Sequence, residues 1–300
     1  MAIYNLGSIN LDHLYRVDHF VRPGETLAST DFQTLLGGKG ANQSIALGRA
    51  GARVHHIGAI SRNDDWVLNE MRASGVDTDR VAQLDGASGH AIIQLDRQAE
   101  NAIILYPGAN HRLTREQIES SLADAGPDDW LLMQHETNGL ADAIELARQK
   151  GLSIAFNPAP MVAEAARPLI RDVDLLIVNE VEAMDLTGTR DIKAAESALT
   201  RDYPQLRILL TLGREGVVYI GPEGREQQLA FQVDAVDTTA AGDTFIGYCL
   251  AALAEGLPPL EAMASGGAAA ALCVTRLGAA QSIPRRDEVD AFLQSHNPTR

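Results

Sequence analysis

The feature that most restricts the fold of this chain is the alternation of short apolar runs with segments of helical periodicity. Apolar runs at 130–133, 154–156 and 175–178 have the length of buried strands. Between the first two, a helical apolar face recurs in Leu140, Ala143, Ile144 and Ala147. This order predicts an α/β fold with a doubly wound, mostly parallel sheet flanked by helices. We expect a single domain that spans residues 1–300.

Two stretches interrupt the alternation, at about 11–35 and 89–106. In the second, apolar runs at 91–95 and 102–105 flank a polar segment, which indicates a β-hairpin. Inserted strands without covering helices predict a small β-sheet lid or a pairing surface, although an ordinary edge hairpin gives the same pattern. A later hairpin is expected from 217–220 and 229–233, followed by Ala-rich helices at about 241–255 and 259–275.

Composition limits the partners that the chain can have. The formal charge of −15 disfavours binding to a phosphate backbone, so we expect no nucleic-acid partner. Cys249 and Cys273 lie in apolar segments and are typical of small buried side chains in a reducing compartment. No leader-like N-terminus and no apolar run of about 18 residues is present, so we expect a cytoplasmic protein without a membrane partner.

A glycine-rich loop, Gly37-Gly-Lys-Gly-Ala-Asn42, stands directly before a helical run that ends near Arg49. Glycines at a helix start let the backbone approach a ligand, and the free N–H groups there favour hydroxyl or anion acceptors. The spacing is not that of a P-loop, and no Gly-x-Gly-x-x-Gly follows the first strand, which argues against a dinucleotide-binding dehydrogenase. Taken alone, the loop is equally typical of a tight turn.

A second candidate, Ala240-Ala-Gly-Asp243, opens an apolar helix. Unpaired N–H groups at such a helix start can stabilise negative charge on a transferring phosphate, and Asp243 beside them can act as a base. The alternative is that Asp243 or Thr239 only caps the helix, because both residue types are favoured caps. This segment alone does not decide between the two.

The two segments together, in this order and about 200 residues apart, resemble the signatures of the ribokinase (PfkB) family of carbohydrate kinases. The resemblance extends almost end to end. Its further motifs are Gly7-Ser-Ile-Asn10-Leu-Asp12, Tyr106-Pro-Gly-Ala-Asn110, Gln134-His-Glu136, Asn157-Pro-Ala-Pro160, Asn179-Glu-Val-Glu182, Thr211-Leu-Gly-Arg-Glu-Gly216, Asp237-Thr-Thr239 and the segment 274–282.

The resemblance implies a sugar site and a catalytic base. Sugar hydroxyls would be held by residues of the first motif, the glycine loop and the segment after 134, namely Asn10, Asp12, Gly38, Lys39, Gly40, Asn42 and Glu136. Such a set suits a polyhydroxy substrate, which needs several fixed polar partners. Asp243 would take the proton from the attacking hydroxyl, and Lys39 would also act on the phosphates.

The resemblance also implies a site for ATP with Mg²⁺. Nucleotide contacts would fall on Asn179, Thr211, Gly213, Arg214, Gly216, Ala241 and Gly242. Glu182 would organise Mg²⁺ through water, as suits a cation that dehydrates reluctantly. Gly267 stands where relatives often have a His or Asn against the nucleotide, so one contact is expected to be missing.

A third implied site is one for an activating monovalent cation, usually K⁺. Its positions would be Asp237, Thr239, Cys273, Arg276, Gly278 and Ser282. Oxygen atoms alone ligate such a cation, so the Cys273 thiol would be a bystander.

The implied reaction is transfer of the ATP γ-phosphoryl group to a sugar primary hydroxyl, with D-ribose giving D-ribose 5-phosphate as the first hypothesis. Deoxyribose, a nucleoside or a hexose derivative are alternatives on the same fold, and a non-catalytic sugar-binding protein is an alternative of another class. A homodimer that pairs two lids is expected from the resemblance.

Overall fold

The computed structural model describes residues 1–98 and 100–296. Its centre is a ten-stranded sheet in the order β14-β13-β12-β11-β10-β9-β1-β4-β5, with β6 paired to β4. All pairs are parallel except β12–β13 and β13–β14. The strands are β1 (Ile3–Leu6), β4 (Val54–Ser61), β5 (Val76–Asp77), β6 (Val81–Leu84), β9 (Trp130–Gln134), β10 (Ser153–Asn157), β11 (Leu175–Asn179), β12 (Arg207–Thr211), β13 (Val217–Gly221) and β14 (Gly224–Gln228).

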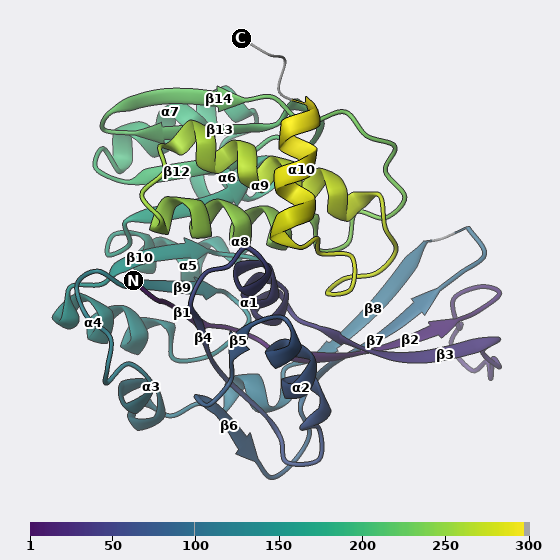
Figure 1. The fold of residues 1–300 in the computed structure, drawn as a ribbon. Coiled ribbons are helices and arrows are strands. Elements are labelled where there is room, and N and C mark those ends of the chain that lie inside the picture. The colour runs from purple at the N-terminus through teal and green to yellow at the C-terminus, as the bar shows by residue number, and fades with distance from the viewer. Residues whose placement is uncertain (99, 297–300) are drawn as a thin grey trace.

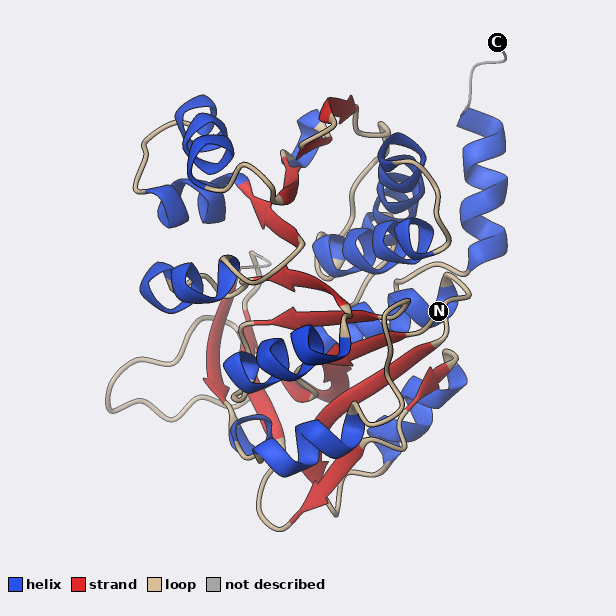
Figure 2. Cartoon of the chain, turned by 90° about the vertical axis from the view of Figure 1, so that its left-hand side faces the viewer, coloured by secondary structure: helices blue, strands red, loops and turns tan. Residues whose placement is uncertain are grey.

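Helices cover both faces of this sheet, as the periodicity predicts (Figure 2). One face carries α1 (Lys39–Arg49), α2 (Trp66–Ala73), α8 (Ala241–Ala254), α9 (Pro259–Val274) and α10 (Arg286–His296). The other carries α3 (Arg115–Ser121), α4 (Leu140–Lys150), α5 (Ala163–Ile170), α6 (Glu180–Thr187) and α7 (Ile192–Asp202). Two short 3₁₀ turns, η1 (Gly108–His111) and η2 (Gly213–Glu215), complete the helical elements of the described chain.

The two faces bury two separate cores because successive strand residues point to opposite sides. In β9, Trp130 and Leu132 pack with the α8 and α9 side, whereas Leu131 and Met133 pack with the α4 and α5 side. Strands buried on both faces read as continuous apolar runs, which is how the sequence displays them.

The stretches that break the alternation form a second, four-stranded sheet in the order β3-β2-β7-β8. It consists of β2 (Asn10–Arg16), β3 (Asp31–Gly37), β7 (Gly89–Leu95) and β8 (Asn101–Tyr106), and it projects away from the helices (Figure 1). The predicted hairpin is β7–β8, with Ile92 opposite Ile104. We call this element the small sheet.

The expected second strand of the later hairpin was wrong. The partner of β13 is the polar strand β14, and the apolar run 229–233 follows it outside any strand. Only two residues separate Gly221 at the end of β13 from Gly224 at the start of β14, so the two strands pair directly after this turn. The polar residues of β14 therefore form the exposed edge of the sheet. The two following helices, α8 and α9, lie within one residue of the predicted bounds.

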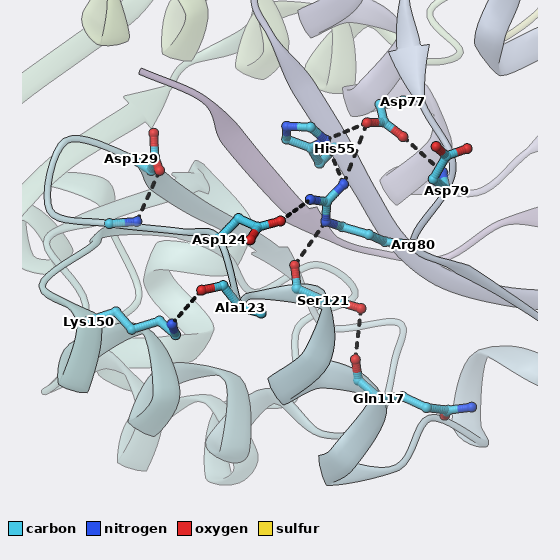
Figure 3. Close-up of polar contacts among 11 residues, drawn as sticks. His55, Asp77, Asp79, Arg80, Gln117, Ser121, Ala123, Asp124, Asp129 and Lys150 are labelled. Carbon is cyan, nitrogen blue, oxygen red and sulfur yellow. Dashed lines mark hydrogen bonds and ion pairs between the residues drawn. The ribbon is translucent and has the colours of Figure 1, made fainter.

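A polar cluster fastens the β4–β5 edge of the main sheet to the end of α3 (Figure 3). The Arg80 guanidinium donates through Nε to Ser121 O at 2.9 Å and lies 5.5 Å from the Tyr4 ring centroid. His55 Nδ1 lies 2.7 Å from Asp77 Oδ2, and burial together with the Arg80 charge lowers the His55 pKa. The cluster joins residues far apart in sequence, and it lies apart from the residues implied above to bind ligands.

Across the described ranges, every helix is too short or too polar to cross a membrane. Cys249 and Cys273 are buried and free, as their apolar surroundings predict.

Candidate active site

A cavity of about 220 Å³ opens where β10, β11 and β12 end and α8 begins. In open α/β sheets, ligands bind at the carboxyl ends of the parallel strands. The lining includes Asn157, Asn179 and Thr211 from those strand ends. Among the residues that the sequence predicts for the site, it also includes Lys39, Glu182, Ala241, Gly242 and Asp243.

Asp243 lies in the first turn of α8 but does not cap it. The N-cap is Ala240, in a left-handed conformation with φ 59°, and no side chain caps this helix. The Asp243 carboxylate instead accepts hydrogen bonds from Asn42 Nδ2 at 3.0 Å and Gln43 Nε2 at 2.9 Å, both on α1. The capping alternative is therefore wrong for Asp243, and its buried carboxylate faces the cavity.

Close packing of α1 against α8 brings these side chains together. A Cβ on Gly247 would lie 2.3 Å from the Ala46 Cβ, so only glycine permits this approach. The apolar faces of both helices pack in the same core. The sequence thus places Asn42 and Gln43 against Asp243 across about 200 residues of chain.

Opposing influences act on the pKa values of Asp243 and Lys39. Burial raises the Asp243 pKa, while Lys39 and the two amide donors oppose that rise. For Lys39, burial works against the charged form, but attraction to Asp243, Glu136 and Glu182 outweighs it and raises the Lys39 pKa. A lysine that stays protonated beside a buried carboxylate supplies positive charge where a phosphate would enter.

A second polar cluster, with Asp12 and Glu136, adjoins the cavity through Lys39, where the small sheet meets the main sheet. Asp12 of β2 is partly buried, and burial followed by repulsion from Glu136 raises the pKa of Asp12 to about 7. Glu136 Oε2 accepts hydrogen bonds from the Ser8 hydroxyl and from the Lys39 backbone N–H, the latter at 3.1 Å. Gly37 of β3, which pairs with Asn10, leaves the space that the Asp12 carboxylate occupies, because a Cβ there would lie 2.0 Å from Asp12 Oδ2.

Asn10 is buried at the same end of β2. Its Oδ1 accepts a hydrogen bond from Asn110 Nδ2 at 2.7 Å. Gly38, with φ 92°, is the N-cap of α1, and Gly40 packs on the backbone of Gly7. The glycine-rich loop therefore packs tightly on the backbone of Gly7 and borders the polar cluster through Lys39.

Asn179 and Glu182 form a capping box at the start of α6. Asn179 Oδ1 accepts from the Glu182 N–H, and Glu182 Oε2 accepts from the Asn179 N–H, each at 2.9 Å. Burial raises the Glu182 pKa. Within the described ranges, no group of three or more His, Cys, Asp or Glu side chains is arranged to hold a metal ion. A single carboxylate such as Glu182 fits Mg²⁺, which usually keeps several waters and binds phosphate oxygens.

The nucleotide residues expected after β12 lie at the rim. Gly213 and Arg214 are exposed in η2, and Gly216, with φ 102°, leads into β13. They are near Thr211 in the chain, but none of them lines the cavity.

Five of the six positions implied for a monovalent cation come together in one loop cluster. Asp237 Oδ1 accepts from the Thr239 N–H and hydroxyl at 2.9 and 2.6 Å, and Asp237 Oδ2 accepts from the Gly278 N–H at 3.0 Å. Burial opposes ionisation of Asp237, but these hydrogen bonds prevail and lower its pKa. Cys273 Sγ lies 3.1 Å from Ser282 Oγ. The side chain of Arg276 instead pairs with Glu288, so only its backbone could serve the cluster.

A model of the pfkB family of carbohydrate kinases matches residues 3–286. The chain belongs to this family. It is therefore a sugar kinase, as the motifs predict.

Individual relatives agree with this assignment. A ribokinase of Haemophilus influenzae is 38% identical over 299 residues, covering 96% of this chain and 97% of the relative. The crystal structure of a ribokinase from Thermotoga maritima superposes with a TM-score of 0.87 at 34% identity, over 98% of this chain and 99% of that one. An Arabidopsis thaliana ribokinase, solved with ribose and ATP, gives a TM-score of 0.87 at 27% identity, over 98% and 99% of the two chains.

Several side chains of this kinase site were not singled out from the sequence. Asn157 lines the cavity, Ser8 holds Glu136, and Gln43 holds Asp243. Asn157 and Ser8 stand inside motifs that carry the resemblance, which is the signal that could have found them. Gln43 stands one residue beyond the glycine loop, and nothing in its local sequence separates it from a surface glutamine.

Proposed function

We propose that the protein transfers the γ-phosphoryl group of ATP to the 5-hydroxyl of D-ribose, with Asp243 as the base. The observation that carries this proposal is the Asp243 carboxylate, which is buried at the start of α8, lines the cavity and is close enough to Glu136 for the two charges to interact. The Arabidopsis relative, which binds ribose and ATP together, supports the choice of substrates.

The polar cluster suits a sugar because its oxygen atoms have acceptor capacity to spare. Asn42 Oδ1 is buried and has no hydrogen-bond partner within the described residues. Ionised Asp12 and Glu136 are acceptors only, and a carboxylate can take two hydroxyl donors. A polyhydroxy ligand satisfies these atoms, whereas an apolar ligand leaves them unpaired at a cost of about 1–3 kcal/mol each.

Transfer of the phosphoryl group needs the base, the phosphates and the hydroxyl to be held in line. Asp243 takes the hydroxyl proton as the oxygen attacks. The backbone N–H groups of Gly242 and Asp243 lie in the first turn of an uncapped helix and favour the charge that builds up on the phosphoryl oxygens. Lys39 adds a full positive charge from the start of α1.

ATP with Mg²⁺ fits the rim formed by Asn179, Glu182 and Thr211. Glu182 would hold Mg²⁺ through water, and when bound this ion neutralises charge on the phosphates. Gly213, Arg214 and Gly216 would border the nucleotide from the η2 turn. Gly267 on α9 offers no side chain of its own, and a Cβ added there would lie 3.6 Å from the ring of Phe231.

A monovalent cation, most simply K⁺, would sit among the backbone oxygens around Asp237. These loops lie just before α8, so the cation would order the backbone that leads to Asp243. The ionised Asp237 supplies the negative charge, while Thr239, Cys273, Arg276, Gly278 and Ser282 supply the surrounding loops. The free thiols and the use of ATP support a cytoplasmic setting.

The small sheet is the proposed lid of the sugar pocket and the proposed dimer interface. Its edge strand β8 exposes Ile103, Ile104, Leu105 and Tyr106, each with about half or more of its surface accessible. A long apolar edge strand is a pairing surface that isolated proteins avoid. A second copy that pairs the same edge would cover it.

We expect light scattering to give the mass of a dimer for the wild-type protein and of a monomer for Ile104→Lys, because a charge in the apolar interface is costly to bury. Leu260→Lys, at an exposed apolar position on α9, is the control and should remain dimeric. A wild-type monomer, or a dimeric Ile104→Lys protein, contradicts an interface at this edge.

The test of the proposed reaction is ADP release measured across D-ribose, deoxyribose, nucleosides and hexose derivatives, in K⁺, Na⁺ and Tris buffers. We expect D-ribose to give the highest kcat/KM and K⁺ to raise the rate. A higher kcat/KM for another member of the panel would reassign the substrate, and equal rates in all three buffers would contradict the cation site. Sugar binding without ADP release would favour the non-catalytic alternative.

A further inference from the structure

Gln43 is fully buried and belongs to none of the sets assigned above to sugar, nucleotide or cation. Its Nε2 lies 2.9 Å from Asp243 Oδ1 and 3.3 Å from Asn157 Oδ1. Its Oε1 accepts a hydrogen bond from Gln134 Nε2 at 2.6 Å. The Gln43 amide therefore connects the proposed base to the ends of β9 and β10.

The orientation of this amide is fixed by its neighbours on one side. Gln134 Nε2 also donates to Asn5 Oδ1 at 2.9 Å, and Asn5 Nδ2 donates to the backbone oxygen of Gly40 at 2.8 Å. Because the Gly40 carbonyl can only accept, each amide in this series can point only one way. Gln43 must then present its oxygen to Gln134.

The contacts with Asn157 and Asp243 require the same orientation of the Gln43 amide. Asn157 Nδ2 donates to the Ile177 carbonyl at 2.9 Å, so Asn157 Oδ1 faces Gln43 as an acceptor. A flipped Gln43 would set its oxygen against Asn157 Oδ1 and the Asp243 carboxylate. Only the orientation with the NH₂ group toward Asp243 avoids two repulsive contacts.

We propose that Gln43 is a positioning residue for phosphoryl transfer, which holds Asp243 Oδ1 in place so that the carboxylate keeps one orientation toward the hydroxyl. Asn42 holds the other oxygen, Oδ2. A carboxylate accepts about four hydrogen bonds, so these two leave capacity for the substrate. The inference rests on the proposed role of Asp243 as the base.

The contact also has an electrostatic effect. Lys39 on α1, Glu136 after β9 and Glu182 on α6 are the charged groups that act on Asp243. Burial raises the Asp243 pKa, and the Gln43 donor is among the contacts that counter this rise. Without that donor the charged form loses a partner, so the pKa of Asp243 rises further.

The test is the pH profile of kcat for two variants of similar shape. Gln43→Met removes the donor, and we expect kcat to fall about 10²-fold with little change in KM, because misplacement of a reacting group costs about that much. Its acid limb should move to higher pH. Gln43→Glu should move the limb further, because two adjacent carboxylates share a proton.

Gln134→Met is the matched control, since it removes a buried amide from the same series but leaves Gln43 on Asp243. If Gln43 were only structural, both methionine variants would lower the thermal midpoint alike and keep the wild-type acid limb. That result would overturn the inference. Retained turnover in Asp243→Asn would contradict the proposed function itself. This result is distinct from the one that overturns the role of Gln43, so the two can be told apart.

Discussion

Asp243→Asn is expected to lower kcat about 10²- to 10⁴-fold, the usual loss when a general base is removed. Asparagine keeps the shape of the side chain but cannot take the hydroxyl proton. The KM values for sugar and ATP should change little, because Asp243 acts on the reacting atom. Single-turnover measurement of ADP formation would separate this loss from slow product release.

Asp234→Asn is a suitable control, since Asp234 is exposed in the segment that leads to α8. It should leave kcat unchanged. Near-normal turnover of Asp243→Asn would rule out its role as the base. The two substitutions change the charge equally, so a general charge effect cannot account for a difference between them.

Asp12→Asn is expected to lower kcat/KM for the sugar by about 10²-fold and to stabilise the protein without sugar at pH 8. The amide loses acceptor capacity for two hydroxyls, and hydrogen bonds to charged groups contribute about 1.5–3 kcal/mol each. Isothermal titration with the sugar and thermal unfolding would measure the two effects. A variant that binds sugar normally would contradict the proposed pocket.

The sign of the stability effect follows from the Asp12 pKa of about 7, above its ordinary value of 3.8. The folded protein holds the Asp12 proton more tightly than the unfolded chain does. The stabilisation that this proton gives to the folded state is therefore full at low pH and is lost as pH rises through about 7. At pH 8 the buried charge costs at most about 4 kcal/mol, which asparagine avoids. At pH 4 the variant should gain little. Asp31→Asn, exposed at the far end of the small sheet, should show neither effect.

Much of the fold was predictable because buried parallel strands leave apolar runs that differ in length and period from helices. The strands around Trp130 and Leu175 and the helices α8 and α9 are examples. The β13–β14 hairpin was misplaced, since an exposed edge strand of polar residues has no such signal, whereas the apolar run after it does. Apolar pattern finds buried strands and the apolar edge strand β8, but it misses a polar edge strand such as β14.

The site was predictable only in part from local sequence. Whether Asp243 caps α8 depends on where the helix begins to within a few residues, which propensity does not resolve. The resemblance supplied Asp12 and Glu136, and the structure brings the two carboxylates close enough to repel each other. The amide series of Asn5, Gln43 and Gln134 joins positions about 130 residues apart, so only the tertiary fold reveals it.

The proposed sugar site takes Asp12 from the small sheet and Glu136 from the turn after β9 of the main sheet, so its two walls belong to different sheets. A sugar bound there would contact both sheets, and part of its binding energy would hold the two sheets together. Release of the phosphorylated product would have to break the same contacts. A substitution that tightens sugar binding through both walls should therefore lower kcat. A higher affinity for the sugar should come with slower turnover in this enzyme.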